Sequence, residues 1–448
     1  MTQPPGTPGW PGRRIGPERL TIGWHQAVRP ASLREHHDVY GPLPAAGQQS
    51  PQDLLDAIAA ARLTGRGGAG FPTATKMRAV AGRRGPAVVV ANGVESEPAS
   101  QKDEALLARA PHLVLDGALL AARAVGASIV HLCLDRTRDR QAHAVLRAIS
   151  EREQAGLDEV VMLAHGLPHR YVASEETALI RWLNGGEARP TTVPPRPFEQ
   201  GVGRRPTLVD NVETLAHVAL IARYGPDWFG QAGHPDTPGT MLITVSGAVG
   251  HPGVYEIEAG TLVGDVLAMC DGNSEDDAVL VGGYFGTWHT ARDLAHLPLS
   301  APGLRGAGAS PGAGVIFVLP PRRCGLAETA RILAFLASQS AQQCGPCRFG
   351  LPAVTDDFAR LAQGRPDRDV LDRLGRRLGA ITGRGACRHP DGAVRMAASA
   401  LAAFASDARA HAAGRPCRGA QRRGSQADHL QIPAPAASTA PWAEDEWR

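Results

Sequence analysis

The sequence predicts an α/β protein in which a helix-covered parallel sheet comes first, a small mixed domain second and a helical bundle third. Three observations support this order. Short apolar segments alternate with helix-patterned segments in the first half of the chain, strand-like segments follow, and the last third is rich in Ala, Leu and Arg at helical spacing. We expect an irregular lead-in over 1–49, three domains over 50–237, 238–320 and 321–410, and a disordered tail over 411–448.

The first domain is expected to open with a helix at Pro51. Ser50 supplies an N-cap side chain, and proline is favoured at the first helical position. Strands are predicted over 87–93, 127–135 and 159–164, with helices over 112–126 and 138–153. Because these strands are continuous apolar runs, both faces of their sheet must be covered, which is typical of the parallel sheet of a Rossmann-like domain.

The second domain shows a different order of elements. Strands are predicted within 240–249, 250–260, 279–286 and 314–320, with a helix over 263–270. This order suits a small β-grasp-like domain. In the third region, over 327–409, helical periodicity is interrupted at two glycine-marked breaks, which predicts a helical bundle.

Composition and charge exclude several classes of protein. Lys and Arg number 47 and Asp and Glu 44, and the net charge of +3 is too small for a dedicated nucleic-acid-binding protein. The apolar runs are far shorter than the roughly 18 residues that a membrane span needs, and the N-terminal segment lacks the apolar stretch of a secretory signal. Seven cysteines in a chain of this length do not make a disulfide framework. We therefore expect a cytoplasmic protein.

A glycine-rich loop follows the first helix. It has the sequence GRGGAGFP, from Gly65 to Pro72, and contains four glycines in six positions. Glycine lets backbone N–H groups approach a phosphate or a flat ring without a Cβ in the way. Lys76 is placed to add positive charge to a bound phosphate. The alternatives are a tight connection and a solvated lysine.

Polar residues also follow the first predicted strand and begin two later helices. Asn92 and Glu95 lie in a loop after the strand, where open α/β sheets bind ligands, and their side chains suit the hydroxyls of a ribose or ribityl chain. A plain polar loop has a similar composition. The segments 174–177 and 210–213 fit helix N-caps with Ser174 and Asp210 leading, and capping alone accounts for them.

Taken together, these motifs resemble a known family. The segments GRGGAGFPT, NGVESEP, PHLVLDGALLAA, YVASEETALI, RPTLVDNVETLA and CGPCRFG occur in the order found in the NADH-binding flavoprotein subunit of respiratory complex I, with relatives in NAD-reducing hydrogenases and formate dehydrogenases. The resemblance covers about residues 50–400. It implies a flavin mononucleotide (FMN) in the Rossmann-like domain, hydride transfer from NADH to the flavin, a β-grasp domain of the SLBB type and a 4Fe-4S cluster in the bundle.

The resemblance also implies site residues. Phe71 matches the aromatic residue that stacks near the nicotinamide, and Glu97 and Glu176 match acids near the dinucleotide. The residues that match the flavin-binding positions of the family are Gly65, Arg66, Gly67, Gly70, Lys76, Asn92, Glu95, Glu175 and Asn211, with Thr214 close behind.

The iron–sulfur motif departs from the family pattern. The family uses a C-x2-C-x2-C run and a fourth cysteine about forty residues downstream, because each iron needs a thiolate. Cys344, Cys347 and Cys387 match the last three ligands, but Ala341 stands in the first position. Three outcomes remain open: a cluster completed by water, His389 or another donor; a 3Fe-4S cluster; and loss of the cluster.

The other four cysteines carry separate expectations. Cys133 and Cys270 lie in apolar segments and are expected to be core residues. Cys324 is twenty residues upstream of Cys344, which we expect to be too far to replace the missing ligand. Cys417 lies in the predicted tail, where it is freer to reach the cluster.

The dinucleotide side departs from the family too. The chain has the segment 76–79, KMRA, where a second aromatic residue is expected, and 193–197, VPPRP, where the family has a Lys and a Phe. An aromatic face contributes on the order of 1 kcal/mol to stacking, so NADH binding is expected to be weaker. Arg196 offers partial compensation by pairing with a dinucleotide phosphate.

The sequence therefore predicts an NADH dehydrogenase-type subunit that binds FMN, uses NAD(H) as substrate and transfers single electrons to an iron–sulfur centre. One alternative keeps the flavin and the iron–sulfur centre but no longer uses NADH, and another is a scaffold or adaptor without a cofactor. The resemblance implies a small ferredoxin-like or thioredoxin-like electron-transfer subunit as partner, and we expect no nucleic-acid partner.

Overall fold

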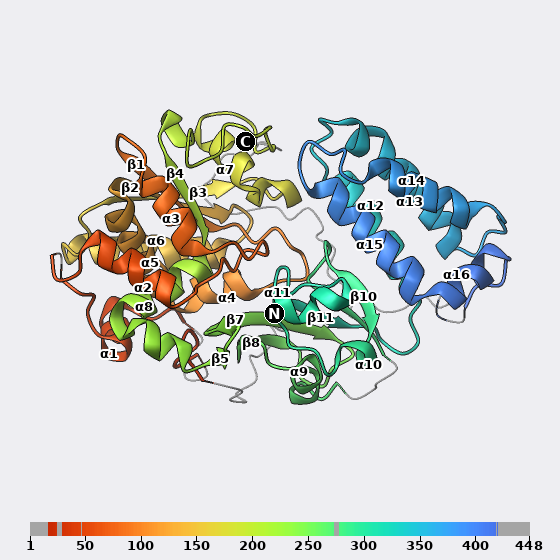
Figure 1. Cartoon of the computed structure of the whole chain (residues 1–448), viewed down its shortest axis with the longest axis horizontal. Coiled ribbons are helices and arrows are strands. Elements are labelled where there is room, and N and C mark those ends of the chain that lie inside the picture. Colours follow the sequence, from red (N-terminus) through yellow and green to blue (C-terminus); the bar gives the residue numbers. More distant parts are fainter. Residues whose placement is uncertain (1–16, 25–28, 46, 273–276, 418, 420–448) are drawn as a thin grey trace, which may run out of the picture.

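The computed structural model describes residues 17–24, 29–45, 47–272, 277–417 and 419, and its elements form three regions (Figure 1). A parallel sheet with its helices comes first, a smaller mixed sheet lies beside it, and a helical bundle forms the far side of the molecule. Most of the predicted tail, 420–448, and the first 16 residues of the predicted lead-in lie outside the described residues. The α/β class and the order of the three parts are as predicted.

The first sheet has four parallel strands in the order β3-β2-β1-β4. Its register places Asn92 of β1 beside Asn211 of β4, so that two predicted site residues end neighbouring strands at the same edge of the sheet. The four strands are β1 (Ala87–Gly93), β2 (Ala127–Asp135), β3 (Val161–Leu167) and β4 (Thr207–Asn211).

Eight helices surround this sheet, and the closest pair is α5 with α8. A Cβ built at Gly117 of α5 would lie 1.7 Å from the carbonyl oxygen of Leu215 in α8, so the backbones meet where only glycine fits. The helices are α1 (Leu33–Tyr40), α2 (Pro51–Ala60), α3 (Thr73–Ala81), α4 (Lys102–Arg109), α5 (Pro111–Val125), α6 (Asp139–Gln154), α7 (Glu176–Leu183) and α8 (Val212–Gly230).

The helix α1 lies in the segment where the sequence showed no sustained periodicity. Ser32 caps it through a capping box with Glu35, and its buried residues are His36 and Tyr40. A helix of two turns offers too few repeats for its period to be detected.

The second region contains a five-stranded sheet in the order β10-β9-β11-β7-β8. β11 runs parallel to β7 and the other neighbours are antiparallel. Its elements are β7 (Thr240–Gly247), β8 (Gly253–Glu258), α9 (Val263–Met269), β9 (Ala278–Val281), β10 (Thr287–Thr290), α10 (Ala291–Leu294), α11 (Ala301–Leu304) and β11 (Val315–Val318); a short ribbon of β5 (Gly233–His234) and β6 (Thr237–Pro238) precedes it.

The helical bundle packs against the second sheet. The backbone N–H of Trp288 in β10 donates to the Ser399 hydroxyl at 3.1 Å, and Phe285 fills the space beside Gly392. A π-helical turn, Pro346–Gly350, precedes α13. The helices are α12 (Gly325–Ser338), α13 (Leu351–Ala362), α14 (Val370–Ile381), α15 (His389–Ala403) and α16 (Ala405–Ala412).

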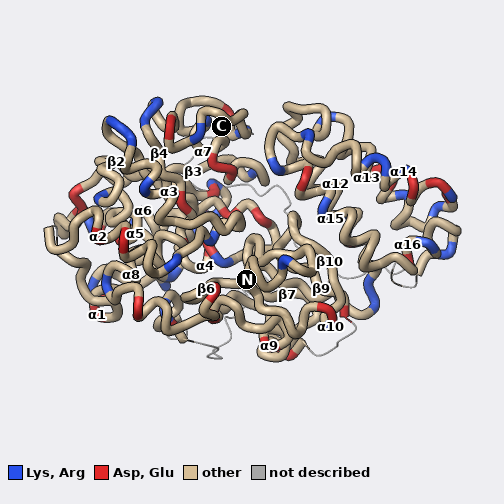
Figure 2. The backbone as a smooth tube through the Cα atoms, viewed as in Figure 1, with Lys and Arg blue, Asp and Glu red and all other residues tan. Residues whose placement is uncertain are grey.

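Residues of both charges occur in all three regions. Lys and Arg are intermixed with Asp and Glu along the tube (Figure 2). Within the described residues, no single helix is long and apolar enough to cross a membrane, and the bent pair α4 and α5 reaches that length and composition only when its two members are combined. Cys133 and Cys270 are fully buried, as expected of core residues.

Candidate functional site

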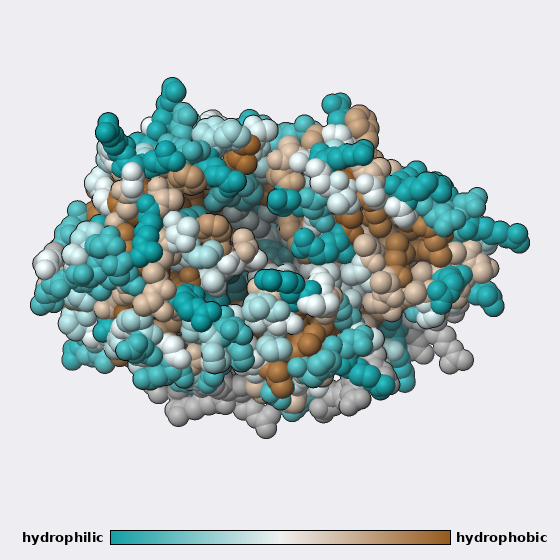
Figure 3. Space-filling model, viewed as in Figure 1, coloured by the Kyte–Doolittle hydropathy of each residue, from teal (hydrophilic) through white to brown (hydrophobic). Residues whose placement is uncertain are grey.

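The predicted binding residues meet at the carboxyl ends of β1 and β4. The glycine-rich loop, the start of α7 and the start of α8 all lie against this edge of the sheet, and we refer to the space they surround as the crevice. The second region closes one side of it, since Gly68 approaches the carbonyl oxygen of Gly312. Figure 3 shows that this face of the molecule is hollowed between the three regions.

The two ends of the glycine-rich loop pair with each other, and glycines without side chains form most of its tip. The Gly65 N–H donates to the Phe71 carbonyl at 2.8 Å, and Thr64 forms a bridge with Pro72. Gly68 and Gly70 have φ values of +100° and +63°, which side chains rarely tolerate. A Cβ at Gly67 would lie 3.3 Å from the Asn211 Cβ. The loop therefore needs glycine both for its turn and for its close approach to α8.

Arg66 anchors the loop to helix α8 and to the second sheet. Its backbone N–H donates to the Thr214 hydroxyl at 2.8 Å, and its guanidinium donates to the Thr240 carbonyl of β7 at 3.0 Å. The Arg66 Nε is buried and has no hydrogen-bond partner among the described residues. The guanidinium lies in the buried space between α8 and β7, near Glu213 and His217.

Lys76 and Asp210 lie next to each other at the end of β4. The Lys76 ammonium donates to the Val209 carbonyl and lies 3.7 Å from Asp210 Oδ1 and 3.6 Å from Glu176 Oε2. Burial raises the pKa of Asp210 to about 6, and the nearby Lys76 charge offsets only part of this rise. Asp210 Oδ2 is buried and unpaired in the part of the chain that the structure describes. It is an unused acceptor.

Asn92 ties the end of β1 to the start of α7. Its side-chain amide donates to the Ser174 carbonyl at 3.0 Å, and its own oxygen accepts the Val94 N–H at 3.2 Å. The Ser96 and Ser174 hydroxyls share a hydrogen bond of 2.5 Å. The two loops are therefore held as one unit.

Three predicted ligand residues are helix caps in this structure. Glu95 accepts the backbone N–H groups of Asp103 and Glu104 at 3.1 and 2.9 Å, at the start of α4. Glu175 accepts the Thr177 and Ala178 N–H groups, and Asn211 accepts the Glu213 N–H at 3.0 Å. The caps of α7 and α8 are therefore Glu175 and Asn211, and the prediction of Ser174 and Asp210 was wrong by one residue in each case.

Glu97 points away from the crevice toward the second region. Its carboxylate accepts the Tyr171 hydroxyl at 2.8 Å, the Tyr284 N–H at 2.9 Å and the Ala99 N–H at 3.2 Å. Burial raises its pKa to about 7, against the lowering effect of these bonds. Glu97 thus joins the β1 loop to the loop after β9.

A buried ionic network supports the crevice and was not predicted from the sequence. The Lys102 ammonium contacts Asp103 at 2.6 Å and Glu213 at 2.8 Å, and Asp103 accepts the Asn211 amide at 2.7 Å. Burial and the Asp103 carboxylate raise the pKa of Glu95 to about 7. The segment QKD at 101–103 was a recognisable signal, since Lys and Asp are seldom buried unless paired.

The residues at the rim of the crevice are more accessible. The Phe71 ring is 53% exposed, and Glu176 and Lys76 are partly exposed as well. An exposed aromatic ring beside a glycine-rich loop is available to stack on a planar ligand.

The crevice fits a flavin mononucleotide. An isoalloxazine ring with a ribityl phosphate offers a donor for Asp210 Oδ2, a buried atom that has no partner among the described residues. The bare glycines at the loop tip admit a phosphate or ring at close range. The donor set is therefore complementary to this cofactor.

Three cysteines meet between α12 and α15. Cys344 and Cys347 are in side-chain contact, and burial raises the pKa of the Cys347 thiol to about 12, with the Cys344 and Cys387 sulfurs adding to the effect. Burial also raises the pKa of the Cys387 thiol, and the nearby Glu175 carboxylate adds to it. The cysteine group therefore lies within electrostatic range of the crevice.

The position of the missing ligand is apolar, since Ala341 is buried. The three thiols suit an iron–sulfur cluster, which needs thiolates from one tight loop and a partner segment. His389 donates its Nε2 proton to the Leu336 carbonyl at 2.8 Å, which leaves Nδ1 as a lone-pair donor without a described partner. Its ring packs against Tyr171 and Phe285. His389 as the fourth ligand stays a prediction.

Cys324 is remote from this group. It precedes α12, whose 14 residues span about 21 Å, and Cys344 follows the other end of the helix. Cys417 lies beside Cys324. The expectation for Cys324 is confirmed, whereas Cys417, which was expected to be free to reach the cluster, is held at the far end of the bundle.

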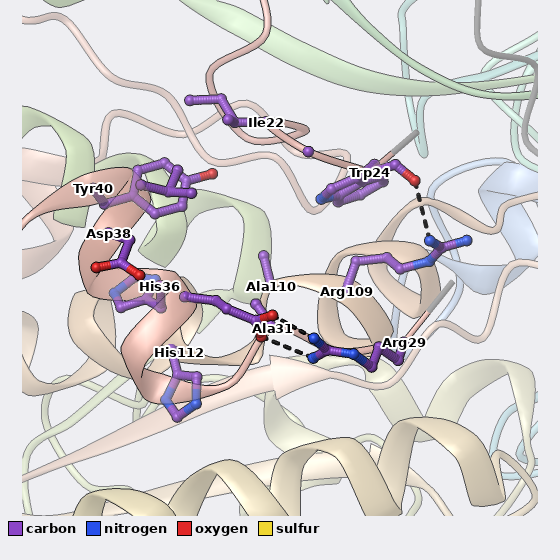
Figure 4. A pocket seen from close by; sticks show the side chains of 13 residues that line it. Ile22, Trp24, Arg29, Ala31, His36, Asp38, Tyr40, Arg109, Ala110 and His112 are labelled. Atoms are coloured by element: carbon purple, nitrogen blue, oxygen red, sulfur yellow. Dashed lines mark hydrogen bonds and ion pairs between the residues drawn. The ribbon is translucent and has the colours of Figure 1, made fainter. Parts of the chain in front are cut away.

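A separate cavity of about 240 Å³ lies between the N-terminal segment, α1 and the start of α5. Arg29 donates to the Glu35 carboxylate at 2.8 Å, and Figure 4 shows Arg109 facing the Trp24 carbonyl at the edge of the cavity. It contains none of the predicted site residues. The crevice, not this cavity, is the place where the motifs converge.

Family models match all three regions. The Nuo51 FMN-binding domain matches residues 58–220, the SLBB domain residues 242–281 and the NADH-ubiquinone oxidoreductase-F iron-sulfur binding region residues 327–411. The resemblance to the complex I flavoprotein is thereby confirmed.

Whole-chain comparisons agree with the family models. The F 2 subunit of the NADH-quinone oxidoreductase of Rhizobium meliloti is 30% identical over 387 residues, covering 83% of this chain and 92% of that protein. The corresponding F subunit of Escherichia coli is 30% identical over 410 residues, covering 87% and 92%. An NAD+-reducing [NiFe]-hydrogenase in the H2-reduced state superposes with a TM-score of 0.76 at 34% identity, covering 86% of this chain and 67% of that one.

Proposed function

Because the chain belongs to the family of the NADH-quinone oxidoreductase F subunits, we propose that it is an FMN-dependent NADH:acceptor oxidoreductase that passes single electrons to an iron–sulfur centre. The observation that carries this proposal is the crevice itself. The glycine-rich loop, the end of β1 and the start of α8 converge there, and one buried acceptor, Asp210 Oδ2, has no partner among the described residues.

The protein groups divide into those that contact the cofactor and those that hold the loops. We assign cofactor contact to the loop from Gly65 to Gly70 and to Asp210 Oδ2, and loop anchoring to the Arg66 side chain. The Glu95, Glu175 and Asn211 side chains are used as helix caps, which supports a role in positioning the loops. Bound FMN supplies a ring that accepts a hydride and gives up electrons one at a time.

The nicotinamide side has one exposed aromatic ring. Phe71 is available for stacking, with Lys76 and Glu176 beside it to contact the polar part of NADH. Hydride transfer depends above all on holding two rings close together. Glu97 is held by Tyr171 and Tyr284, which supports a role in fixing the β1 loop against the second region.

A second candidate keeps the flavin but does not use NADH. Two observations favour it. The Glu97 carboxylate already accepts hydrogen bonds from protein donors. The turn at 193–197 also lacks the Lys and the Phe that the family has there, and carries Arg196 instead. Anaerobic titration separates the two candidates. NADH should bleach the flavin absorbance of the purified protein if the first is right, and bleaching by dithionite alone supports the second.

The flavin assignment has a matched pair of variants. Arg66→Ala should lose at least 90% of the bound flavin, whereas Arg84→Ala, an exposed arginine between α3 and β1, should keep it. Circular dichroism checks that both variants fold. A colourless wild-type protein that takes up no FMN on incubation would overturn the proposal.

We further propose a small acidic one-electron carrier of the ferredoxin type as the electron acceptor. Arg348, Arg384 and Arg388 are exposed and adjoin the three cysteines in sequence, and Phe349 beside them is 70% exposed. Cationic side chains around a redox centre attract an acidic partner and speed its association. The Arg388 side chain is only loosely paired, at 3.4 Å from Asp391.

A further inference from the structure

A second group of metal-ligating side chains lies at the end of the bundle opposite the redox cysteines. It consists of Cys324, His411 and Cys417, whose ligand atoms all lie within 4.8 Å of one another. Cys324 and His411 are buried and Cys417 is half-buried. None of the three belongs to the crevice or to the group formed by Cys344, Cys347 and Cys387.

Cys324 is held at the start of α12, where it is the N-cap residue. Its thiol contacts the Cys417 thiol; burial raises the pKa of the Cys324 thiol, and the nearby backbone N–H groups of Leu326 and Ala327 oppose that rise. The first N–H groups of a helix favour negative charge on a nearby sulfur. This position therefore suits a thiolate ligand.

His411 is oriented by the bundle. Its Nδ1 donates to the Leu361 carbonyl of α13 at 3.0 Å, so the lone pair of the ring lies on Nε2. A backbone carbonyl that fixes the tautomer in this way is typical of a metal-binding histidine. Nε2 accepts the Cys417 N–H at 2.8 Å, and this bond has to open for a metal ion to bind.

The segment that carries Cys417 is packed against the bundle. Pro416 fills the space beside Gly364, Pro366 fills that beside Gly414, and the Asp367 N–H donates to the Ala412 carbonyl at 3.0 Å. The shift that frees Nε2 is therefore local to residues 415–417. The sulfur of Cys417 stays near that of Cys324.

We propose that Cys324, His411 and Cys417 bind a thiophilic divalent cation of the Zn²⁺ class. Two sulfurs and one imidazole nitrogen are the donors that Zn²⁺ prefers, with water in the fourth position. On binding, both thiols release their protons to solvent and the cation's charge is balanced by the two thiolates. No electron is transferred.

The ion would join three parts of the bundle. It connects the start of α12, the end of α16 and the segment after it, at about 21 Å from the redox loop along α12. It therefore fastens the segment 415–417 to the bundle and leaves the redox path unaffected.

Metal analysis of the full-length protein with its native cofactors tests the proposal. We expect about one zinc per chain in addition to iron. Cys417→Ala should lower zinc at least fivefold and leave iron unchanged, whereas Cys344→Ala should lower iron and keep zinc. The comparison also excludes zinc bound at a damaged iron–sulfur site, which would give the opposite pattern and overturn the proposal.

A spectroscopic measurement keeps the test independent of activity. Co²⁺ added to zinc-depleted protein should give thiolate-to-metal absorption in the near ultraviolet that the Cys417→Ala variant lacks. Two other results would contradict the proposal: wild-type protein that binds neither zinc nor Co²⁺, and a Cys324–Cys417 disulfide in a non-reducing peptide map of freshly purified protein.

Discussion

Asp210 is buried at the end of β4 with one unpaired oxygen, and burial raises its pKa from 3.8 to about 6. The folded protein thus holds this proton more tightly than the unfolded chain does. The ionised carboxylate destabilises the fold, by an amount that grows as the pH rises from about 4 to about 6 and is complete above that.

We predict that Asp210→Asn stabilises the flavin-free protein at pH 7.5. The free energy of unfolding should rise by on the order of 2–3 kcal/mol, and the gain should shrink to a fraction of this near pH 4. Urea denaturation at the two pH values measures it. Asp236→Asn, an exposed acid, is the control and should change little. An equal gain at both pH values would contradict the assignment.

Tyr171 and Glu97 form the buried hydrogen bond that joins the β1 loop to the second region. Tyr171→Phe removes one of the three donors to the Glu97 carboxylate and leaves the ring in place. We expect a loss of about 1–3 kcal/mol in the free energy of unfolding, because a buried carboxyl group loses a hydrogen-bond partner. Tyr224→Phe, whose half-exposed hydroxyl donates to the Tyr40 carbonyl at 3.1 Å, should cost less. Similar losses in both variants would argue against a special role for Glu97.

The residue types of the crevice could be predicted from the sequence, but their partners could not. Gly65, Lys76, Asn92 and Asn211 were found by motif, and all four lie at the carboxyl edge of the sheet. That Glu95 caps α4 follows from a contact eight residues away, which no local pattern encodes. Whether each predicted residue contacts a cofactor stays a prediction.

At the scale of elements, the contact between α5 and α8 is set by one glycine. Gly117→Ala would place a methyl carbon 1.7 Å from the Leu215 carbonyl oxygen, so the helices must separate. We predict a loss of more than about 3 kcal/mol in stability, or no soluble protein. Gly375→Ala in α14, where nothing lies within 4 Å, should instead stabilise by up to about 1 kcal/mol. Chemical denaturation compares them, and a mild effect at Gly117 would contradict the packing.

Buried elements were predicted best. The strands over 87–93 and 127–135 match β1 and β2 residue for residue, because continuous apolar runs between glycine and polar breaks mark strands of a parallel sheet. The four-residue strand β10 was missed, since TWHT has neither a sustained apolar run nor a clear alternation. Its pairing with β9 depends on the turn through Gly282 and Gly286.

At the scale of the whole molecule, the crevice depends on contacts between regions that are far apart in the sequence. Arg66 reaches Thr240, Gly68 meets Gly312, and the cysteine group lies near Glu175. The motifs indicated that the three regions belong to one electron-transfer subunit. Only the tertiary structure shows that the loop of the second region closes the crevice and that the redox cysteines lie beside it.

The surface around the redox cysteines gives the last prediction. Arg384 and Arg388 are exposed beside Cys387, and reversing both charges with Arg384→Glu and Arg388→Glu should weaken docking of an acidic ferredoxin-type carrier. We expect its apparent KM to rise at least fivefold at low salt and the difference to fade above about 0.3 M salt, because screening shortens the range of the attraction. Stopped-flow bleaching of the flavin by NADH should stay unchanged, since the crevice residues are untouched.

The matched control is Arg365→Glu with Arg368→Glu. These two exposed arginines lie in the loop after α13 and do not adjoin the cysteines, so the KM should stay as it is. Equal effects of the two pairs would mean that net charge, not this surface, governs electron delivery.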